Sequence, residues 1–319
     1  MKLLLYQLFF VSILTIFCLI SCSKSDRLND GCTYPDIVPF QPFSQPVWHP
    51  NGKIFGFNFT PLSAIIPSSN TSSSCIWYFY SPKDDSTGFY IFNIDGSGFS
   101  RITNYAINCP SWSPDGKWLA FSNGGNIYKM YFNGVGFDTT NIIKLTSQGV
   151  NFYPSWSLNS DTIFYDSNIG TNGQGYYIWS MASDSSGKKG FPNTGRYPFV
   201  GSDGKVYYSG LHYEIFCMNK NGTDIEQLTY NNIQIKVRNN IRCLNDTIFY
   251  EEEGYSYLFN NGISKLISNS CLNFDINKNR KIIYSTPPAS ITTISKQMGT
   301  LWIINSDGTN NIQITFNHI

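Results

Sequence analysis

The chain has 319 residues, of which 41% are hydrophobic, so it can build the core of one large all-β domain or of two average domains, and disorder over most of its length is excluded. Only 13% of the residues are charged, 16% are aromatic, and the formal net charge is +1. This balance excludes the basic surface expected of a protein that binds nucleic acid or attaches to a membrane surface by charge. Residues that favour strands and tight turns outnumber helix formers, which indicates an all-β protein.

The first segment has the features of an export signal. Lys2 precedes an apolar run from Leu3 to Ile20, and the chain turns polar from Ser23 onward. A charged start, an apolar middle and a small-residue cleavage context are typical of a signal peptide. An uncleaved transmembrane anchor is the alternative, because a run of this length almost spans a bilayer. We therefore expect residues 1–21 to be a signal peptide.

The end of this segment, Leu19-Ile20-Ser21-Cys22, resembles the lipobox of bacterial lipoproteins. In that motif the cysteine becomes the new N-terminus and carries the lipid, so the resemblance implies lipidation of Cys22. It also implies a lipid-anchored protein of the bacterial cell envelope, with the outer membrane as the expected location and the chain facing the periplasm or the exterior. A plain signal peptide is the alternative. Residues 22–44 are expected to form a polar linker.

Six cysteines remain after removal of the signal and lipidation of Cys22. They are Cys32, Cys75, Cys109, Cys217, Cys243 and Cys271. An even number in an oxidising compartment permits up to three disulfides, and ordinary buried thiols are the alternative. The spacings contain no C-x2-C or H-x3-H pair, so we expect no metal site built on cysteine, and no cofactor.

One sequence pattern recurs through residues 45–319. Its clearest copy reads Cys109-Pro110-Ser111-Trp112-Ser113-Pro114-Asp115-Gly116-Lys117 and continues through Trp118 to Ser122. Copies of good quality begin at Gln45 and Tyr153, and degraded copies begin at Tyr197, Cys243 and Ile276. Six copies at a mean period of about 45 residues indicate a propeller or an array of repeats.

Each copy divides into four short strands. The first ends at a Trp-Ser pair, the second alternates aliphatic and aromatic residues, the third closes on Asp-Gly or Asn-Gly, and the fourth ends in Leu-Thr or Ile-Thr. Asp-Gly and Asn-Gly provide the positive φ angles that tight hairpin turns require. Four antiparallel strands in about 45 residues match the size of one propeller blade. The sequence therefore predicts an all-β, six-bladed β-propeller of four-stranded antiparallel blades over residues 45–319.

The block from Pro110 to Phe121, followed by Ile-Tyr and Leu-Thr, resembles the WD-like propeller repeat of the TolB family, which also occurs in the propellers of prolyl-peptidase relatives. The resemblance covers residues 45–319 and implies the fold. TolB adds an N-terminal α/β domain, for which this chain has only about twenty residues, so the partners of TolB are not carried over. One propeller fold hosts many activities, so the resemblance alone does not assign a function.

Three tryptophans, Trp48, Trp112 and Trp156, recur at one blade position, so we interpret them as packing between blades and not as a ligand platform. The Asp-Gly-Lys residues are interpreted as turn chemistry. Residues 93–97 and 305–308 faintly resemble calcium loops, but they lack the regular ligand spacing and the closing Glu. No metal site is predicted.

The sequence contains no signature of a known enzyme class. It has no Gly-x-Ser-x-Gly elbow, no Gly-x-Gly-x-x-Gly after a strand, no Walker loop and no His-Glu-x-x-His. His49 and His318 are interpreted as bystanders. A pair of carboxylates across the channel would escape a motif search, so a propeller enzyme, such as a glycan lyase or hydrolase with its site at the channel mouth, is the alternative function.

Loop lengths favour one face of the propeller as a binding surface, because functional loops are longer than structural connections. The face with the first-to-second-strand turns has tight turns. The opposite, loop-rich face receives the insertions within residues 59–89, 166–175 and 286–299. We predict partner contacts on that face through Tyr78, Tyr80, Arg196, His212 and Arg238. The alternative for Trp77 to Tyr80 is an extended hairpin that covers a blade edge.

These observations predict a non-enzymatic binding or scaffolding module. The expected partner is an envelope protein or peptide, or a carbohydrate, and no nucleic acid is expected. The membrane is expected to be reached through the lipid anchor only.

Overall fold

The computed structural model describes residues 43–60, 62–67, 78–82, 85–171, 175–230, 236–268, 271, 273–286 and 300–315, with the backbone alone for 62–67, 78–82 and residue 193. The chain separates into two compact units, residues 1–36 with 67–77 and residues 37–66 with 78–319. The second unit is described below. The predicted signal peptide and Cys22 lie outside the described residues. Within the described ranges, no helix is long and apolar enough to cross a membrane.

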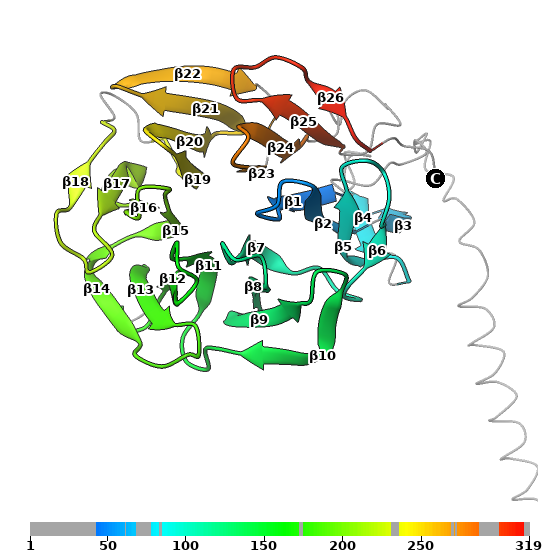
Figure 1. Ribbon diagram of the computed structural model, residues 1–319, viewed down its shortest axis with the longest axis horizontal. Helices are drawn as coiled ribbons and strands as arrows, with labels where there is room; N and C mark the ends of the chain where they lie inside the picture. The colour runs from blue at the N-terminus through cyan, green and yellow to red at the C-terminus, as the bar shows by residue number, and fades with distance from the viewer. Residues whose placement is uncertain are drawn as a thin grey trace, which may run out of the picture. The chain divides into compact units, whose positions relative to one another are not determined.

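The second unit contains six four-stranded antiparallel sheets, so the prediction of a six-bladed β-propeller is confirmed. In Figure 1 the sheets follow one another around a ring, and the first strand of each blade lies nearest the centre. Blade 1 is made of β1 (Phe43–Trp48), β2 (Ile54–Phe59), β5 (Gly88–Asn93) and β6 (Ser100–Arg101). Blade 2 is made of β7 (Asn108–Trp112), β8 (Trp118–Asn123), β9 (Asn126–Phe132) and β10 (Phe137–Lys144). Blade 3 is made of β11 (Asn151–Trp156), β12 (Thr162–Ser167), β13 (Tyr177–Ala182) and β14 (Lys189–Thr194).

The second half of the chain repeats this order. Blade 4 is made of β15 (Arg196–Val200), β16 (Val206–Ser209), β17 (Ile215–Met218) and β18 (Glu226–Gln227), with a short 3-10 turn, η1 (Leu211–Tyr213), between β16 and β17. Blade 5 is made of β19 (Arg238–Leu244), β20 (Thr247–Glu252), β21 (Tyr255–Asn260) and β22 (Ile263–Ser268). Blade 6 is made of β23 (Asn273–Ile276), β24 (Lys281–Ser285), β25 (Leu301–Asn305) and β26 (Ile312–Gln313).

The insertion of blade 1 contains a two-stranded sheet formed by β3 (Leu62–Pro67) and β4 (Tyr78–Pro82). Strand pairing of the segment that begins at Tyr78 agrees with the hairpin alternative for this aromatic run. The side chains of Tyr78 and Tyr80 lie outside the described part, so their predicted contact with a partner stays a prediction.

The first-to-second-strand turns use the predicted Asp-Gly chemistry. In blade 2 the Gly116 N–H donates to the Ser113 carbonyl at 2.8 Å, and Gly116 has a φ of 71°. The Asp115 carboxylate accepts the Lys117 N–H at 3.0 Å and the Ser113 hydroxyl at 2.5 Å. A short acidic side chain followed by glycine therefore closes the turn through contacts within it, and the Asp115 N–H also donates to Ser160 Oγ of blade 3 at 3.2 Å.

The Leu-Thr and Ile-Thr pairs at the blade ends have a common structural role. Each threonine hydroxyl accepts the first free N–H of the third strand of its own blade, at distances between 2.8 and 3.1 Å. The threonines are Thr103, Thr146, Thr229 and Thr315. A hydrogen bond of this kind contributes about 1 kcal/mol. In each of these blades it attaches the segment that follows the fourth strand to the third strand.

The hydrophobic core lies between the blades. Trp48 packs with residues of blade 6, Trp112 with residues of blade 1, and Trp156 with residues of blade 2. All three side chains are buried, and the interpretation of these tryptophans as packing between blades is confirmed.

Among the described strands, none is shared between the first and last blades of the ring. In the described part, all four strands of blade 6 follow those of blade 5 in the sequence, and none pairs with blade 1. The contact between the two blades consists of side-chain packing, in which Ile283, Leu301 and Ile303 meet the phenylalanines of blade 1. One hydrogen bond supplements it, from the Trp48 N–H to Asp275 Oδ2 at 2.7 Å.

The four cysteines that the structure describes are free thiols. Cys109, Cys217, Cys243 and Cys271 form no disulfide, whereas Cys32 and Cys75 lie outside the described residues. For these four the disulfide alternative is therefore wrong. Cys217, Cys243 and Cys271 are buried thiols, and Cys109 is a half-buried thiol. Burial raises the pKa of the Cys109 thiol to about 12 and that of the Cys243 thiol to about 11, so both stay protonated and unreactive at neutral pH.

Candidate functional site

The innermost strands share a bulge that points side chains at the axis of the ring. Five of the six strands contain a register shift at the same place. At each shift one residue has a positive φ: Gln45, Cys109, Tyr153, Tyr197 and Asn240. Four of these residues precede a proline, which disfavours the right-handed helical region for them. Strain of about 1 kcal/mol per residue is common where a backbone is bent for function.

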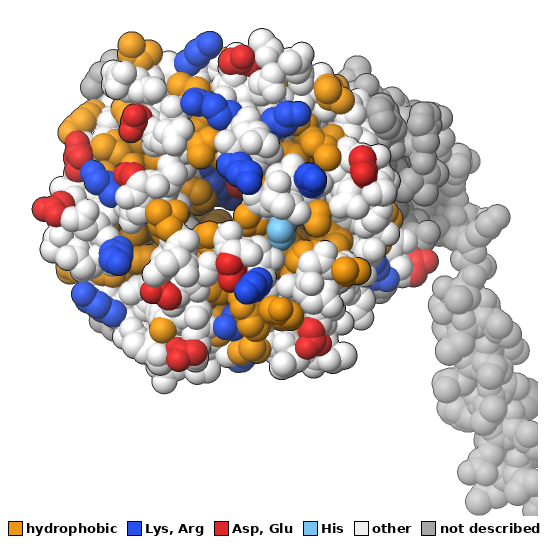
Figure 2. Space-filling model, viewed as in Figure 1, with side chains coloured by type: hydrophobic (Ala, Val, Ile, Leu, Met, Phe, Trp, Pro, Cys, Tyr) orange, Lys and Arg blue, Asp and Glu red, His pale blue; other side chains and the backbone are white. Residues whose placement is uncertain are grey.

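These bulges surround a central cavity of about 510 Å³, lined by the first strands of all six blades. It extends from the bulge residues to the first-to-second-strand turns, where Pro50, Pro114, Leu158 and Lys278 line it. Figure 2 shows a hollow at the centre of the ring, with hydrophobic side chains in its wall and Lys and Arg side chains near its rim. The cavity therefore lies toward the face with tight turns, and not toward the loop-rich face.

The wall of the cavity is aromatic, with one buried ion pair. Its aromatic side chains are those of Trp48, Trp112, Tyr153, Trp156, Tyr197, Phe199 and Phe274. The Arg242 Nε donates to Asp275 Oδ1 at 2.7 Å, and the guanidinium lies 5.1 Å from the ring centre of Phe199. Among the described lining residues Asp275 has the one carboxylate, which both Arg242 and the Trp48 N–H already contact.

His49 lines the cavity but uses both ring nitrogens within the protein. Its Nδ1 accepts the Asn51 N–H at 3.1 Å, so Nε2 carries the proton and donates it to the Gly116 carbonyl at 3.0 Å. The ring also contacts Trp112 edge to face, with a centroid distance of 4.5 Å. His49 thus joins the turns of blades 1 and 2, and a Cβ at Gly116 would lie only 2.7 Å from Nε2.

Beyond the bulge residues, on the loop-rich side, Arg196 lies among three tyrosines. Its guanidinium is 4.2 Å from the ring centre of Tyr176, 5.0 Å from that of Tyr197 and 5.8 Å from that of Tyr153. Its Nε donates to Asp166 Oδ2 at 3.2 Å. Asp166 is fully buried, and this burial raises the pKa of its carboxyl to about 7 despite the nearby guanidinium.

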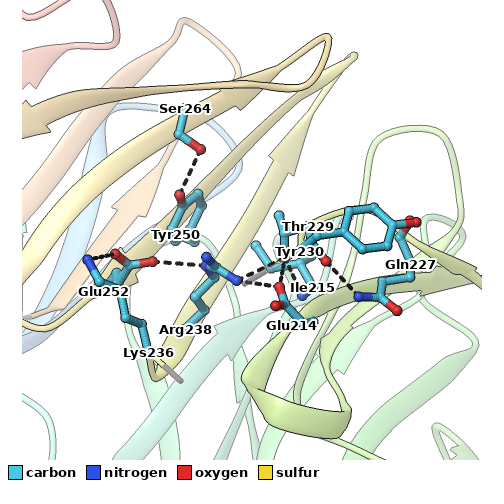
Figure 3. Close-up of polar contacts among 10 residues, drawn as sticks. All are labelled: Glu214, Ile215, Gln227, Thr229, Tyr230, Lys236, Arg238, Tyr250, Glu252 and Ser264. Carbon is cyan, nitrogen blue, oxygen red and sulfur yellow. Dashed lines mark hydrogen bonds and ion pairs between the residues drawn. The ribbon is translucent and has the colours of Figure 1, made fainter. Parts of the chain in front are cut away.

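Arg238 lies in a buried polar cluster between blades 4 and 5 (Figure 3). Its Nε donates to Glu252 Oε2 at 2.9 Å, and its Nη1 donates to Glu214 and to the Thr229 hydroxyl. The Lys236 ammonium donates to the other oxygen of Glu252 at 2.9 Å. The Arg238 side chain is 10% exposed. It therefore holds two blades together, and its predicted contact with a partner stays a prediction.

His212 belongs to the exposed turn η1, directly before Glu214. On one side of this turn, Glu214 contacts Arg238. On the other side, Tyr213 adds to the effect of burial in raising the pKa of Tyr197, which lies next to Arg196. The three predicted contact residues therefore occupy one region of blades 4 and 5. Arg196, His212 and Arg238 thus share the loop-rich side of these blades, although they differ in exposure.

A further buried carboxyl, that of Glu251 near the end of β20, is only 8% exposed, and the described residues offer it no hydrogen-bond partner. Burial raises the pKa of this carboxyl to about 8. It lies near Cys271, whose thiol pKa is raised by burial and further by Glu251. Glu251 is therefore largely protonated at neutral pH.

No three His, Cys, Asp or Glu side chains in the described ranges are grouped so that they could hold a metal ion.

Comparison with known proteins establishes the fold. No protein-family profile matches the sequence, and no curated protein matches it. TolB from Acinetobacter baumannii has a TM-score of 0.59 at 16% identity, covering 71% of this chain and 59% of that chain. The β-propeller domain of the Trilobed protease from Pyrococcus furiosus, described as having an open velcro topology, has a TM-score of 0.53 at 14% identity, covering 88% and 100%. An oligogalacturonate lyase in complex with manganese has a TM-score of 0.51 at 10% identity, covering 88% and 79%.

This chain therefore shares its fold with TolB-like β-propellers, and it spans 59% of the length of the Acinetobacter protein. The same fold occurs in a lyase and in a protease domain, so fold alone does not decide between binding and catalysis.

Proposed function

We propose that this chain is a non-catalytic binding module of the bacterial cell envelope, and that its ligand, a peptide or a short glycan segment, enters the central cavity. The observation that carries the proposal is the cavity of about 510 Å³, which is lined by all six blades and has aromatic side chains from five of them. Its volume lies within the range of about 300–1,000 Å³ that is typical of small-ligand sites.

The chemistry of the wall supports recognition without catalysis. The half-buried rings of Tyr153, Tyr197 and Phe199 can stack on peptide side chains or on sugar rings. The exposed Lys278 side chain adds a positive charge, and the Arg242 guanidinium is paired with Asp275. A glycoside hydrolase needs two carboxyl groups that face each other. Asp275 is the one acidic side chain among the described lining residues, and its oxygens are already occupied. This favours binding over the alternative of a glycan hydrolase.

The location is proposed on the sequence of the first segment. A lipid on Cys22 would hold the propeller at the membrane, because each buried CH₂ contributes about 0.8 kcal/mol. Incorporation of labelled palmitate into the wild type, and its loss in a Cys22→Ala variant, is the expected result. Equal labelling of both would remove the anchor from the proposal.

The cavity is tested by filling it. Ser111 lines the cavity at the repeat position where blade 4 carries Phe199. The Ser111→Phe variant therefore places a phenyl group at a backbone position that already holds one in blade 4. The matched control is Thr139→Phe on the exposed edge strand β10. Both variants and the wild type are titrated with a library of tri- to hexapeptides and of glycan fragments, followed by tryptophan fluorescence, since three tryptophans line the cavity.

We expect ligands found with the wild type to bind Thr139→Phe equally and Ser111→Phe about tenfold more weakly or worse. Wild-type affinity of a folded Ser111→Phe variant would show that the ligand binds elsewhere, and the loop-rich face would then be the candidate. Cleaved products from a glycan probe would overturn the assignment as a non-catalytic module.

A further inference from the structure

Arg196 is held rigidly at the loop-rich side of blade 4. The three tyrosine rings pack against its guanidinium, with ring centres between 4.2 and 5.8 Å away. Tyr153 and Tyr197 also contact each other edge to face, at a centroid distance of 4.5 Å. A planar guanidinium that stacks on aromatic faces loses little further freedom when it binds a ligand.

The hydrogen bonds of Arg196 leave its outer edge available. Nε donates to Asp166 Oδ2, whereas the terminal Nη1 and Nη2 groups have no partner among the described residues. The side chain is 34% exposed, and Asp166 behind it is fully buried. Two parallel N–H groups on the exposed edge of an arginine match the two oxygens of a carboxylate.

We propose that Arg196 binds the C-terminal carboxylate of a peptide on the loop-rich face, at a second site that borders the central cavity and shares the rings of Tyr153 and Tyr197 with its wall. The carboxylate accepts hydrogen bonds from the Nη groups, and the tyrosines hold the guanidinium in place.

Exposed apolar side chains follow Ser209, which pairs with Arg196 in the sheet, and they favour a peptide end over a free anion. Leu211 and Tyr213 of the turn η1 are 63% and 41% exposed. Tyr213 is close enough to Tyr197 to contribute, after burial, to the raised pKa of that hydroxyl. A carboxylate receptor beside exposed apolar groups suits a terminal residue that presents both a carboxylate and a side chain.

Asp166 competes with the ligand for the same guanidinium. Burial raises the pKa of the Asp166 carboxyl to about 7. The groups that face it keep their protons at that pH, because burial raises the pKa of Cys109 to about 12 and also raises the pKa values of Tyr153 and Tyr197. A bound carboxylate places a second negative charge near Asp166, so binding is coupled to protonation of Asp166.

The test uses N-acetyl-leucine, and N-acetyl-leucinamide as the matched probe that lacks the charge. Binding to the full chain is followed by NMR of arginine side-chain N–H resonances and by titration calorimetry in two buffers of different ionisation enthalpy. The variants are Arg196→Gln, Arg196→Lys and Asp166→Asn, and Lys144→Gln controls for the loss of one exposed positive charge. Thermal unfolding establishes that each variant is folded.

We expect the acid to bind and the amide not to bind. Arg196→Gln is expected to weaken binding about tenfold or more, Arg196→Lys to give an intermediate loss because it keeps the charge without the fork, and Lys144→Gln to behave as the wild type. Asp166→Asn removes the competing charge and is expected to tighten binding, and the calorimetry is expected to show uptake of a fraction of a proton near pH 7.

Equal binding of acid and amide, or wild-type binding by Arg196→Gln, would overturn the proposal. Glucuronate and inorganic phosphate are titrated as further probes, and tighter binding of either one at Arg196 would assign the site to a sugar acid or to a phosphate instead. A Ser111→Phe variant that still binds N-acetyl-leucine separates this site from the central cavity, so the two proposals can fail independently.

Discussion

Replacement of Glu251 by glutamine is expected to remove a pH-dependent loss of stability. In the folded protein burial raises the pKa of this carboxyl from 4.5 to about 8, so between these pH values the folded state holds a proton that the unfolded state has lost. Stability therefore falls as the pH rises through this window and levels off above the folded pKa. Each pH unit in the window costs about 1.4 kcal/mol, which sums to an upper limit of about 5 kcal/mol. Relaxation of the site and entry of water reduce it, and we expect about 3 kcal/mol.

Glutamine has nearly the same shape and cannot ionise, so the variant lacks this loss. The assay is urea unfolding of both proteins followed by tryptophan fluorescence, at several values between about pH 5 and about pH 9. The variant is expected to gain stability relative to the wild type as the pH rises and to keep that gain at the alkaline end. Asp166 is present in both proteins, so its own titration cancels in the difference.

Glu253, two residues further along and exposed, provides the control. Glu253→Gln is expected to leave the pH profile of stability unchanged. A difference between Glu251→Gln and the wild type that stays constant across the pH range would refute the reasoning, because it would mean that the carboxyl titrates alike in the folded and unfolded chains.

Three further outcomes are expected. Arg238→Met removes the cation between Glu214 and Glu252, so two buried carboxylates lose their shared partner. The free energy of unfolding measured with urea is expected to fall by about 3–5 kcal/mol. A loss below about 1 kcal/mol would contradict the cluster's structural role. Asp275→Ala removes the hydrogen bond to the Trp48 amide, so hydrogen exchange of that amide is expected to accelerate more than exchange in blade 3, and uniform acceleration would contradict a local effect. The four described cysteines are expected to resist a thiol reagent at pH 8 until the protein unfolds, as mapped by mass spectrometry, and rapid labelling of the folded chain would contradict their burial.

The repeat was predictable because the blades form the same tight turn and the same packing contact from similar residues at the same positions. The tight turn at Asp115-Gly116 and the buried Trp112 are encoded within a dozen neighbouring positions, so they can be recognised without knowledge of the other blades. The degraded copies also fold into complete blades, although the fifth has Ile241 and Cys243 where the clearest copy has proline and tryptophan.

The site was less predictable because it depends on pairs that lie in different blades. Arg242 occupies the repeat position of Ser111, and nothing local indicates that its partner is Asp275 on the next blade. Arg238 was predicted to face a partner because its position falls on the loop-rich side. Its burial follows from Glu214 and Glu252, which approach it from two blades.

The cavity was missed for a different reason. The prediction from loop length favoured the face with insertions as the binding surface. The cavity is lined instead by the first strands, whose bulges turn residues such as Tyr153 and Tyr197 toward the axis. A signal was present in the sequence, since an aromatic, polar or sulfur-containing residue precedes the proline in the three good copies and in the degraded copy that begins at Tyr197. Its meaning depends on the positive φ that the bulge imposes.

In residues 43–315, as far as they are described, blades 1 and 6 share no strand, and this affects the order in which the chain can fold. In the described part, each blade pairs its strands only with one another, and the hydrogen bond at the seam joins residues 227 positions apart. A blade can therefore complete its sheet as soon as its own residues are available, with the short loop closures that favour rapid folding. A chain that emerges with its N-terminus first can build the propeller blade by blade, and the contact of Trp48 with Asp275 forms last, when the sixth blade meets the first.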